Sequence, residues 1–133
     1  MGAGIKKGVG GKANIVALTG ALGAGKTTFV QGLAKGLGIE GRIVSPTFIL
    51  MRKYKVPQNK SRINNLFHVD LYRLEGDLER EVEGLGLTEI WNDPGNVVVI
   101  EWADRMEKWL PKGTRWVRFE YKSEDERRIR IDE

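Results

Sequence analysis

The stretch LTGALGAGKTTF, residues 18–29, constrains the fold of this chain more than any other segment. It contains three glycines and joins a short apolar run at 14–20 to an amphipathic run at 26–38. Glycine weakens regular structure because it loses more backbone entropy on folding than other residues. A glycine-rich loop between a predicted strand and a predicted helix therefore indicates a backbone that must approach a ligand closely.

The loop matches the pattern G-x-x-x-x-G-K-[ST], with Gly20, Gly25, Lys26 and Thr27 at the defining positions. In such a P-loop the backbone N–H groups point at one phosphate, and the following helix adds the positive end of its dipole. Lys26 is predicted to act in catalysis by reaching the β- and γ-phosphates, and the Thr27 hydroxyl to ligate Mg²⁺. The predicted nucleotide-binding residues of the loop are Gly20, Ala21, Leu22, Gly23, Ala24, Gly25, Lys26, Thr27 and Thr28.

Hydrolysis also needs a carboxylate at the end of a neighbouring strand, to hold the metal's water shell or orient an attacking water. The run NVVVIE ends in Glu101 and the run NLFHVD ends in Asp70. We assign Glu101 to the water and the metal shell, and Asp70 to the metal or to a switch, with the reverse assignment left open. His68, the only histidine, is expected to pack or hydrogen-bond near the nucleotide rather than to bind a transition metal. Trp102 either stacks near the nucleotide or fills the core.

The segment SPTF, residues 45–48, follows the first helix by one loop. This region of many P-loop proteins carries a Ser or Thr that senses the γ-phosphate, which makes Ser45 and Thr47 switch candidates. The alternative is a turn set by Pro46.

The remaining patterns predict a single α/β domain of the P-loop NTPase-like class, with a mixed parallel and antiparallel sheet flanked by helices. Residues 1–13 are expected to be a flexible Gly-rich leader, and 14–133 the P-loop ATPase domain. The other predicted elements are an antiparallel pair at 47–56 and 63–74, helices at 78–86 and 103–110, a central strand at 96–101, and a hairpin of 115–121 and 127–133 with one wet face.

Composition fits a soluble protein of the cytoplasm. The 133 residues are 41% hydrophobic and 30% charged, and they include no cysteine. No apolar run approaches the ~20 residues that span a bilayer, so no membrane association is expected. The net charge is +4, and the basic segment at 52–62 contains no acid. That segment contacts RNA or an acidic partner, or it is a solvated hairpin loop.

The ordered segments GALGAGKTTFVQGLAKGLGI, SPTF, FHVDLYRL, LGLTEI and VVVIEWADR resemble the TsaE (YjeE) family. Members are bacterial P-loop ATPases required for threonylcarbamoyladenosine modification of tRNA. The resemblance implies that ATP and Mg²⁺ bind at Lys26 and Thr27, and that Thr47 is the polar sensor of the switch. It implies that Asp70 and Glu101 are needed for activity and that Trp102 binds near the nucleotide.

The resemblance also implies a partner. The family acts on a TsaB–TsaD heterodimer and so meets tRNA indirectly, and ATP hydrolysis is thought to reset that complex between turnovers. Two features depart from the family pattern: Ala21 stands where members often have an acid, and the glycine-rich leader stands where many have a helix before the first strand.

The sequence leaves two alternative functions open. A nucleotide-dependent binding module would bind ATP and dock without useful turnover, and a small-molecule P-loop kinase would transfer the phosphoryl group to an acceptor other than water. A GTPase is rejected because the guanine-reading N-K-x-D motif is represented only by NKSR, with Arg62 where the acid belongs.

Overall fold

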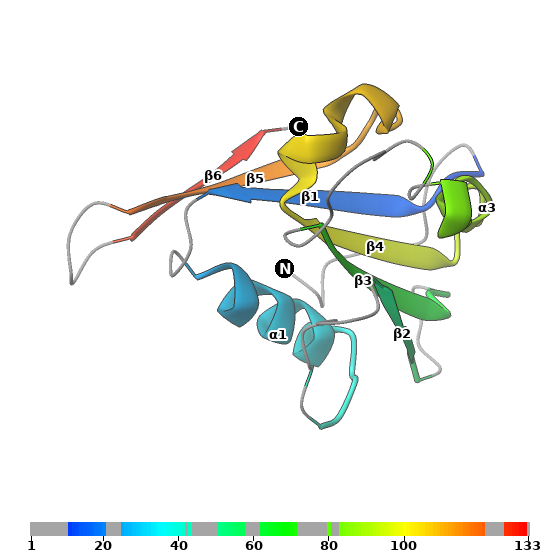
Figure 1. The fold of residues 1–133 in the computed structure, drawn as a ribbon. Helices are drawn as coiled ribbons and strands as arrows, with labels where there is room; N and C mark the ends of the chain where they lie inside the picture. Colours follow the sequence, from blue (N-terminus) through cyan, green and yellow to red (C-terminus); the bar gives the residue numbers. More distant parts are fainter. Residues whose placement is uncertain are drawn as a thin grey trace.

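The computed structural model describes residues 11–20, 25–41, 43, 51–57, 62–71, 80, 83–121 and 127–132. Figure 1 shows their arrangement as a twisted sheet with helices on both sides. The elements in chain order are β1 (Asn14–Gly20), α1 (Lys26–Gly36), β2 (Met51–Lys55), β3 (Asn65–Asp70), α3 (Leu87–Trp91), β4 (Asn96–Glu101), the 3₁₀ helix η2 (Ala103–Trp109), β5 (Arg115–Tyr121) and β6 (Arg127–Asp132).

The strands form one six-stranded sheet in the order β2-β3-β4-β1-β5-β6. The four inner strands β3, β4, β1 and β5 run parallel, whereas β2 and β6 add antiparallel to the two edges. The central strand β4 is buried along its whole length, as its continuous apolar run predicts for a strand covered on both faces. The α/β class with a mixed sheet flanked by helices is therefore confirmed.

Strand alternation divides the core into two layers. On one face, Val30 and Leu33 of α1 pack over Val16 and Val99 of the sheet. On the other face, side chains of α3 and η2 pack over the intervening sheet residues, which include Ile100. Among the described helices, α1 is the one that Figure 1 shows on this side of the sheet. Successive residues of a strand point to opposite faces of the sheet. A side chain at the end of a central strand therefore faces either α1 or η2, depending on whether it lies an even or an odd number of residues from those already assigned to a layer.

Three predicted elements are refined by the structure. The helix predicted at 26–38 ends at Gly36, with Leu37 as its C-cap and Gly38 in the left-handed region at φ 84°. The pair predicted at 47–56 and 63–74 is confirmed as the antiparallel β2 and β3. The helix predicted at 103–110 is a 3₁₀ helix, kinked where Met106 leaves helical geometry.

The predicted C-terminal hairpin is confirmed as β5 and β6, but its one-wet-face pattern holds only for β5. Ile129 and Ile131 of β6 are 52% and 50% exposed, although their register partners Phe119 and Val117 are buried. The reason is position, because β6 is an edge strand.

Some predictions fall outside the described residues. These are residues 1–10 of the leader, residues 21–24 of the loop, both switch candidates Ser45 and Thr47, and residues 78, 79, 81 and 82 of the helix predicted at 78–86, of which 80, 83 and 84 are helical. Among the described helices, none combines the length and the apolar character that crossing a bilayer requires.

Candidate functional site

The first and last glycines of the loop, Gly20 and Gly25, adopt backbone conformations that favour glycine. Gly20 ends β1 at φ 127° and Gly25 precedes α1 at φ 105°, both in the region that favours glycine. A Cβ on Gly20 would lie 2.3 Å from the carbonyl oxygen of Phe119 on β5. Phe119 also packs edge-on against Phe29 of α1, with ring centroids 5.6 Å apart. The strand and the helix on either side of the loop are therefore both anchored on β5.

Gly20→Ala should lower the free energy of unfolding by about 2 kcal/mol or more, because both the left-handed φ and the contact with Phe119 exclude a side chain. Gly32→Ala is the matched control, since Gly32 lies inside α1 with open space around it. That change should stabilise the protein by up to about 1 kcal/mol through helix propensity. Urea unfolding of the two variants checks the difference, and equal stabilities would contradict the close packing of β1 on β5.

Lys26 begins α1, and its side chain is turned inward. The residue is only 5% exposed. Its Nζ donates a 2.8 Å hydrogen bond to the carbonyl oxygen of Gly20 and lies 3.5 Å from the ring centroid of Trp102. Burial lowers the pKa of the ammonium below its usual 10.5, while the carboxylates of Glu101, Asp70 and Asp104 oppose that shift. A partly desolvated cation is thus held at the carboxyl end of β1, among acidic groups.

The two predicted carboxylates are brought together by the parallel strands. Asp70 ends β3 and Glu101 ends β4, and the two residues are register partners. Both share strand parity with the layer under α1, to which Leu66 and Val99 belong. Glu101 is 4% exposed, and Asp70 is half-buried. The sheet therefore places both acids on the side of Lys26.

His68 lies beneath these acids in β3 and is 1% exposed. Its Nε2 is 2.6 Å from Oε2 of Glu101. The hydrogen-bonding part of the prediction for His68 is confirmed, and its place near a nucleotide stays a prediction. Nothing in the sequence identified the partner, because the two residues are brought together only by the pairing of β3 with β4.

Trp102 follows Glu101 in an unusual conformation, with φ 61°. Its ring is partly buried against the layer of α3 and η2, and one face lies under the Lys26 ammonium. The core-packing hypothesis for Trp102 is therefore confirmed in part, and stacking near a nucleotide stays a prediction. The η2 helix that follows brings Asp104 into the electrostatic field of Lys26, which sequence reasoning missed.

Arg105 of η2 makes a hydrogen bond to the backbone of the segment after β3. Its guanidinium donates a 2.7 Å hydrogen bond to the carbonyl oxygen of Leu71, just beyond Asp70. The backbone N–H of Leu71 in turn donates to the carbonyl of Glu101. These bonds tie together the chain segments that follow β3 and β4.

The structure thus gathers Gly20, Lys26, Asp70, Glu101 and Trp102, while Thr27 and Thr28 lie exposed on the first turn of α1. In the described part of the chain, no group of three or more His, Cys, Asp or Glu side chains is placed to hold a metal ion. Mg²⁺ in nucleotide sites takes one or two carboxylates together with waters and phosphate oxygens, so the donors here fit it in chemistry.

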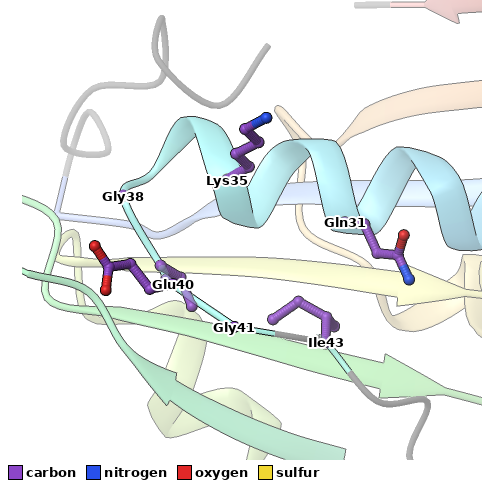
Figure 2. Close-up of a pocket in the computed structure, with 7 residues that line it drawn as sticks. Gln31, Lys35, Gly38, Glu40, Gly41 and Ile43 are labelled. Atoms are coloured by element: carbon purple, nitrogen blue, oxygen red, sulfur yellow. The ribbon is translucent and has the colours of Figure 1, made fainter.

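A separate hollow of about 860 Å³ lies along the C-terminal half of α1 (Figure 2). Lys26 begins the same helix and does not line this hollow. The lining residues of the hollow are Gln31, Lys35, Gly38, Ile39, Glu40, Gly41 and Ile43. It shares no residue with the cluster around Lys26.

The sequence and the structure of the chain are similar to those of known proteins. The family model of the threonylcarbamoyl adenosine biosynthesis protein TsaE matches residues 2–129. The relatives include proteins named tRNA threonylcarbamoyladenosine biosynthesis protein TsaE from three bacteria. The Bacillus subtilis protein is 39% identical over 87% of this chain, the Nostoc protein 50% over 70%, and the Streptomyces coelicolor protein 40% over 90%.

These alignments span 67%, 54% and 68% of the three relatives, so the chain matches only part of their length. Among solved structures, the crystal structure of Bacillus subtilis YdiB superposes with a TM-score of 0.68 at 34% identity, covering 96% of this chain and 70% of that one. The chain belongs to the TsaE family of threonylcarbamoyl adenosine biosynthesis proteins.

Proposed function

We propose that this protein is an ATPase of tRNA threonylcarbamoyladenosine biosynthesis that binds ATP with Mg²⁺ and hydrolyses it on a TsaB–TsaD heterodimer. One observation carries the proposal: Lys26 converges with the carboxylates of Asp70 and Glu101 at the carboxyl ends of three neighbouring parallel strands. In open α/β sheets, ligands bind at that edge. The family relation supplies the tRNA pathway.

The residues divide the chemistry of phosphoryl transfer among them. The backbone of the loop from Gly20 to Gly25 and the Lys26 ammonium bind the phosphates, and the Thr27 hydroxyl ligates Mg²⁺. Mg²⁺ supplies neutralisation of the charge that develops on the phosphate oxygens. One carboxylate orients the attacking water and the other supports the metal's water shell. Lys26 must leave the Gly20 carbonyl to reach the phosphates, and the rotatable four-carbon stem of a lysine permits this.

The isolated protein should be a poor ATPase. Transition-state charge is commonly stabilised by an arginine, which contributes a factor of roughly 10³–10⁵ when it is supplied. Arg105, one candidate within the chain, is hydrogen-bonded to the Leu71 carbonyl. Phosphate release should therefore rise by about tenfold or more when purified TsaB–TsaD is added. The measurement is steady-state phosphate release with and without the partner at fixed salt.

The same assay separates the alternatives. Full-rate hydrolysis by the chain alone would contradict partner activation. ATP binding with no phosphate release in either condition would favour the binding module, and phosphate found on a small acceptor rather than in water would indicate a kinase.

A further inference from the structure

The buried contact between His68 and Glu101 has no role in the chemistry described above. The two side chains are 1% and 6% exposed, and Nε2 lies 2.6 Å from Oε2. A glutamate side chain has several rotatable bonds, and restricting them at the end of a strand costs entropy. A contact this short between two buried side chains restricts the carboxylate strongly.

The other ring nitrogen of His68 shows which way the hydrogen bond runs. Nδ1 is buried and has no hydrogen-bond partner among the described residues. A buried N–H donor left without an acceptor is costly, so the arrangement favours a neutral ring with its proton on Nε2. His68 then donates to Oε2 of Glu101, and Nδ1 is a bare acceptor.

Glu101 is also the carboxylate that acts most strongly on the Lys26 ammonium. A glutamate free to rotate would move toward that cation, and the ion pair would remove both groups from the phosphate site. Instead, the Lys26 Nζ lies on the carbonyl of Gly20, and the carboxylate lies on His68. The opposite charges are close but bound to different partners.

We infer that His68 is a positioning residue: it holds Glu101 by Oε2, keeps the carboxylate away from Lys26 and presents Oε1 to the water that attacks ATP. This rests on the proposed ATPase function. It also distinguishes the roles of the two carboxylates, because Glu101 is buried and held by His68, whereas Asp70 is half-buried at the same edge of the sheet. The water-polarising role goes to Glu101, and Asp70 supports the metal shell.

Three substitutions separate positioning from packing. His68→Leu fills similar space without a donor, His68→Gln can place an amide N–H near the position of Nε2, and His68→Asn places one near Nδ1, too short to reach Glu101. With TsaB–TsaD present, His68→Leu and His68→Asn should lower kcat by about 10- to 100-fold, with the Kd for ATP changed by less than about threefold. His68→Gln should recover most of the loss. Leu66→Val, on the same face of β3, is the packing control and should leave kcat unchanged.

A second readout does not depend on turnover. His68 is the only histidine, so its imidazole signals in ¹⁵N-labelled protein need no assignment. The spectrum should show the Nε2–H tautomer with a downfield Nε2 proton, and Glu101→Ala should shift that proton upfield or abolish it. An Nδ1–H tautomer, or a proton unaffected by Glu101→Ala, would overturn the inference.

The two experiments keep the two proposals apart. If the wild type hydrolyses ATP with TsaB–TsaD and His68→Leu turns over equally fast, the positioning role is wrong and the ATPase stands. If His68→Gln is as slow as His68→Leu, the hydrogen bond is not the reason for the loss, and the inference also fails. If the wild type does not hydrolyse ATP with the partner, the proposed function fails, and the role of His68 in holding Glu101 is then decided by the NMR spectrum alone.

Discussion

Glu101→Gln should separate nucleotide binding from hydrolysis. The amide keeps the size of the side chain, and its oxygen can still accept the hydrogen bond from His68, so the buried contact survives. The substitution removes the negative charge that polarises water or holds the Mg²⁺ shell, so turnover with TsaB–TsaD should fall by roughly 100-fold or more. The Kd for ATP should stay near that of the wild type, because the phosphate contacts come from the loop backbone and Lys26. Single-turnover phosphate release and equilibrium binding measure the two effects.

Asp70→Asn is the matched comparison, since Asp70 is the register partner of Glu101 on the next strand. If Asp70 supports the metal, its variant should show the greater loss of Mg²⁺-dependent binding. Normal turnover by Glu101→Gln together with trapped ATP in Asp70→Asn would reverse the two assignments. If neither variant changes turnover, the hydrolytic mechanism is wrong and the binding module becomes the better account.

Lys26→Ala should abolish productive nucleotide binding and leave the fold intact. The ammonium supplies charge-assisted hydrogen bonds to phosphate, so its loss should weaken ATP binding by about 100-fold or more. The fold should survive because Lys26 contributes to no apolar layer and its buried charge carries a desolvation cost, as its lowered pKa indicates. Titration calorimetry gives the affinity, and circular dichroism checks the fold.

Lys35→Ala is the control for charge on the same helix, since Lys35 is exposed in the last turn of α1. Its ATP affinity should match that of the wild type. An unchanged affinity in Lys26→Ala would refute the P-loop assignment. Loss of the Lys26 ammonium from the face of Trp102 should also alter the tryptophan fluorescence of the nucleotide-free protein.

Local sequence patterns were sufficient to predict several strands and helices. The apolar run before Gly20 predicted β1. The spacing of four between Phe29, Leu33 and Leu37 predicted α1, because side chains on one face of a helix recur at about 3.6 residues. The unbroken apolar run from 96 to 101 predicted a strand buried on both faces, and β4 is one. The carboxylates at the strand ends were identified in the same way, from a polar residue that closes an apolar run.

The sequence did not predict which of these side chains contact one another, because such contacts depend on strand order and register. His68 and Glu101 lie 33 residues apart, and the parallel pairing of β3 with β4 brings them to 2.6 Å. Lys26 likewise contacts the Gly20 carbonyl and the Trp102 ring only because the fold brings together β1, α1 and the end of β4. The exposure of Ile129 follows from the edge position of β6, which a local pattern of alternating residues cannot reveal.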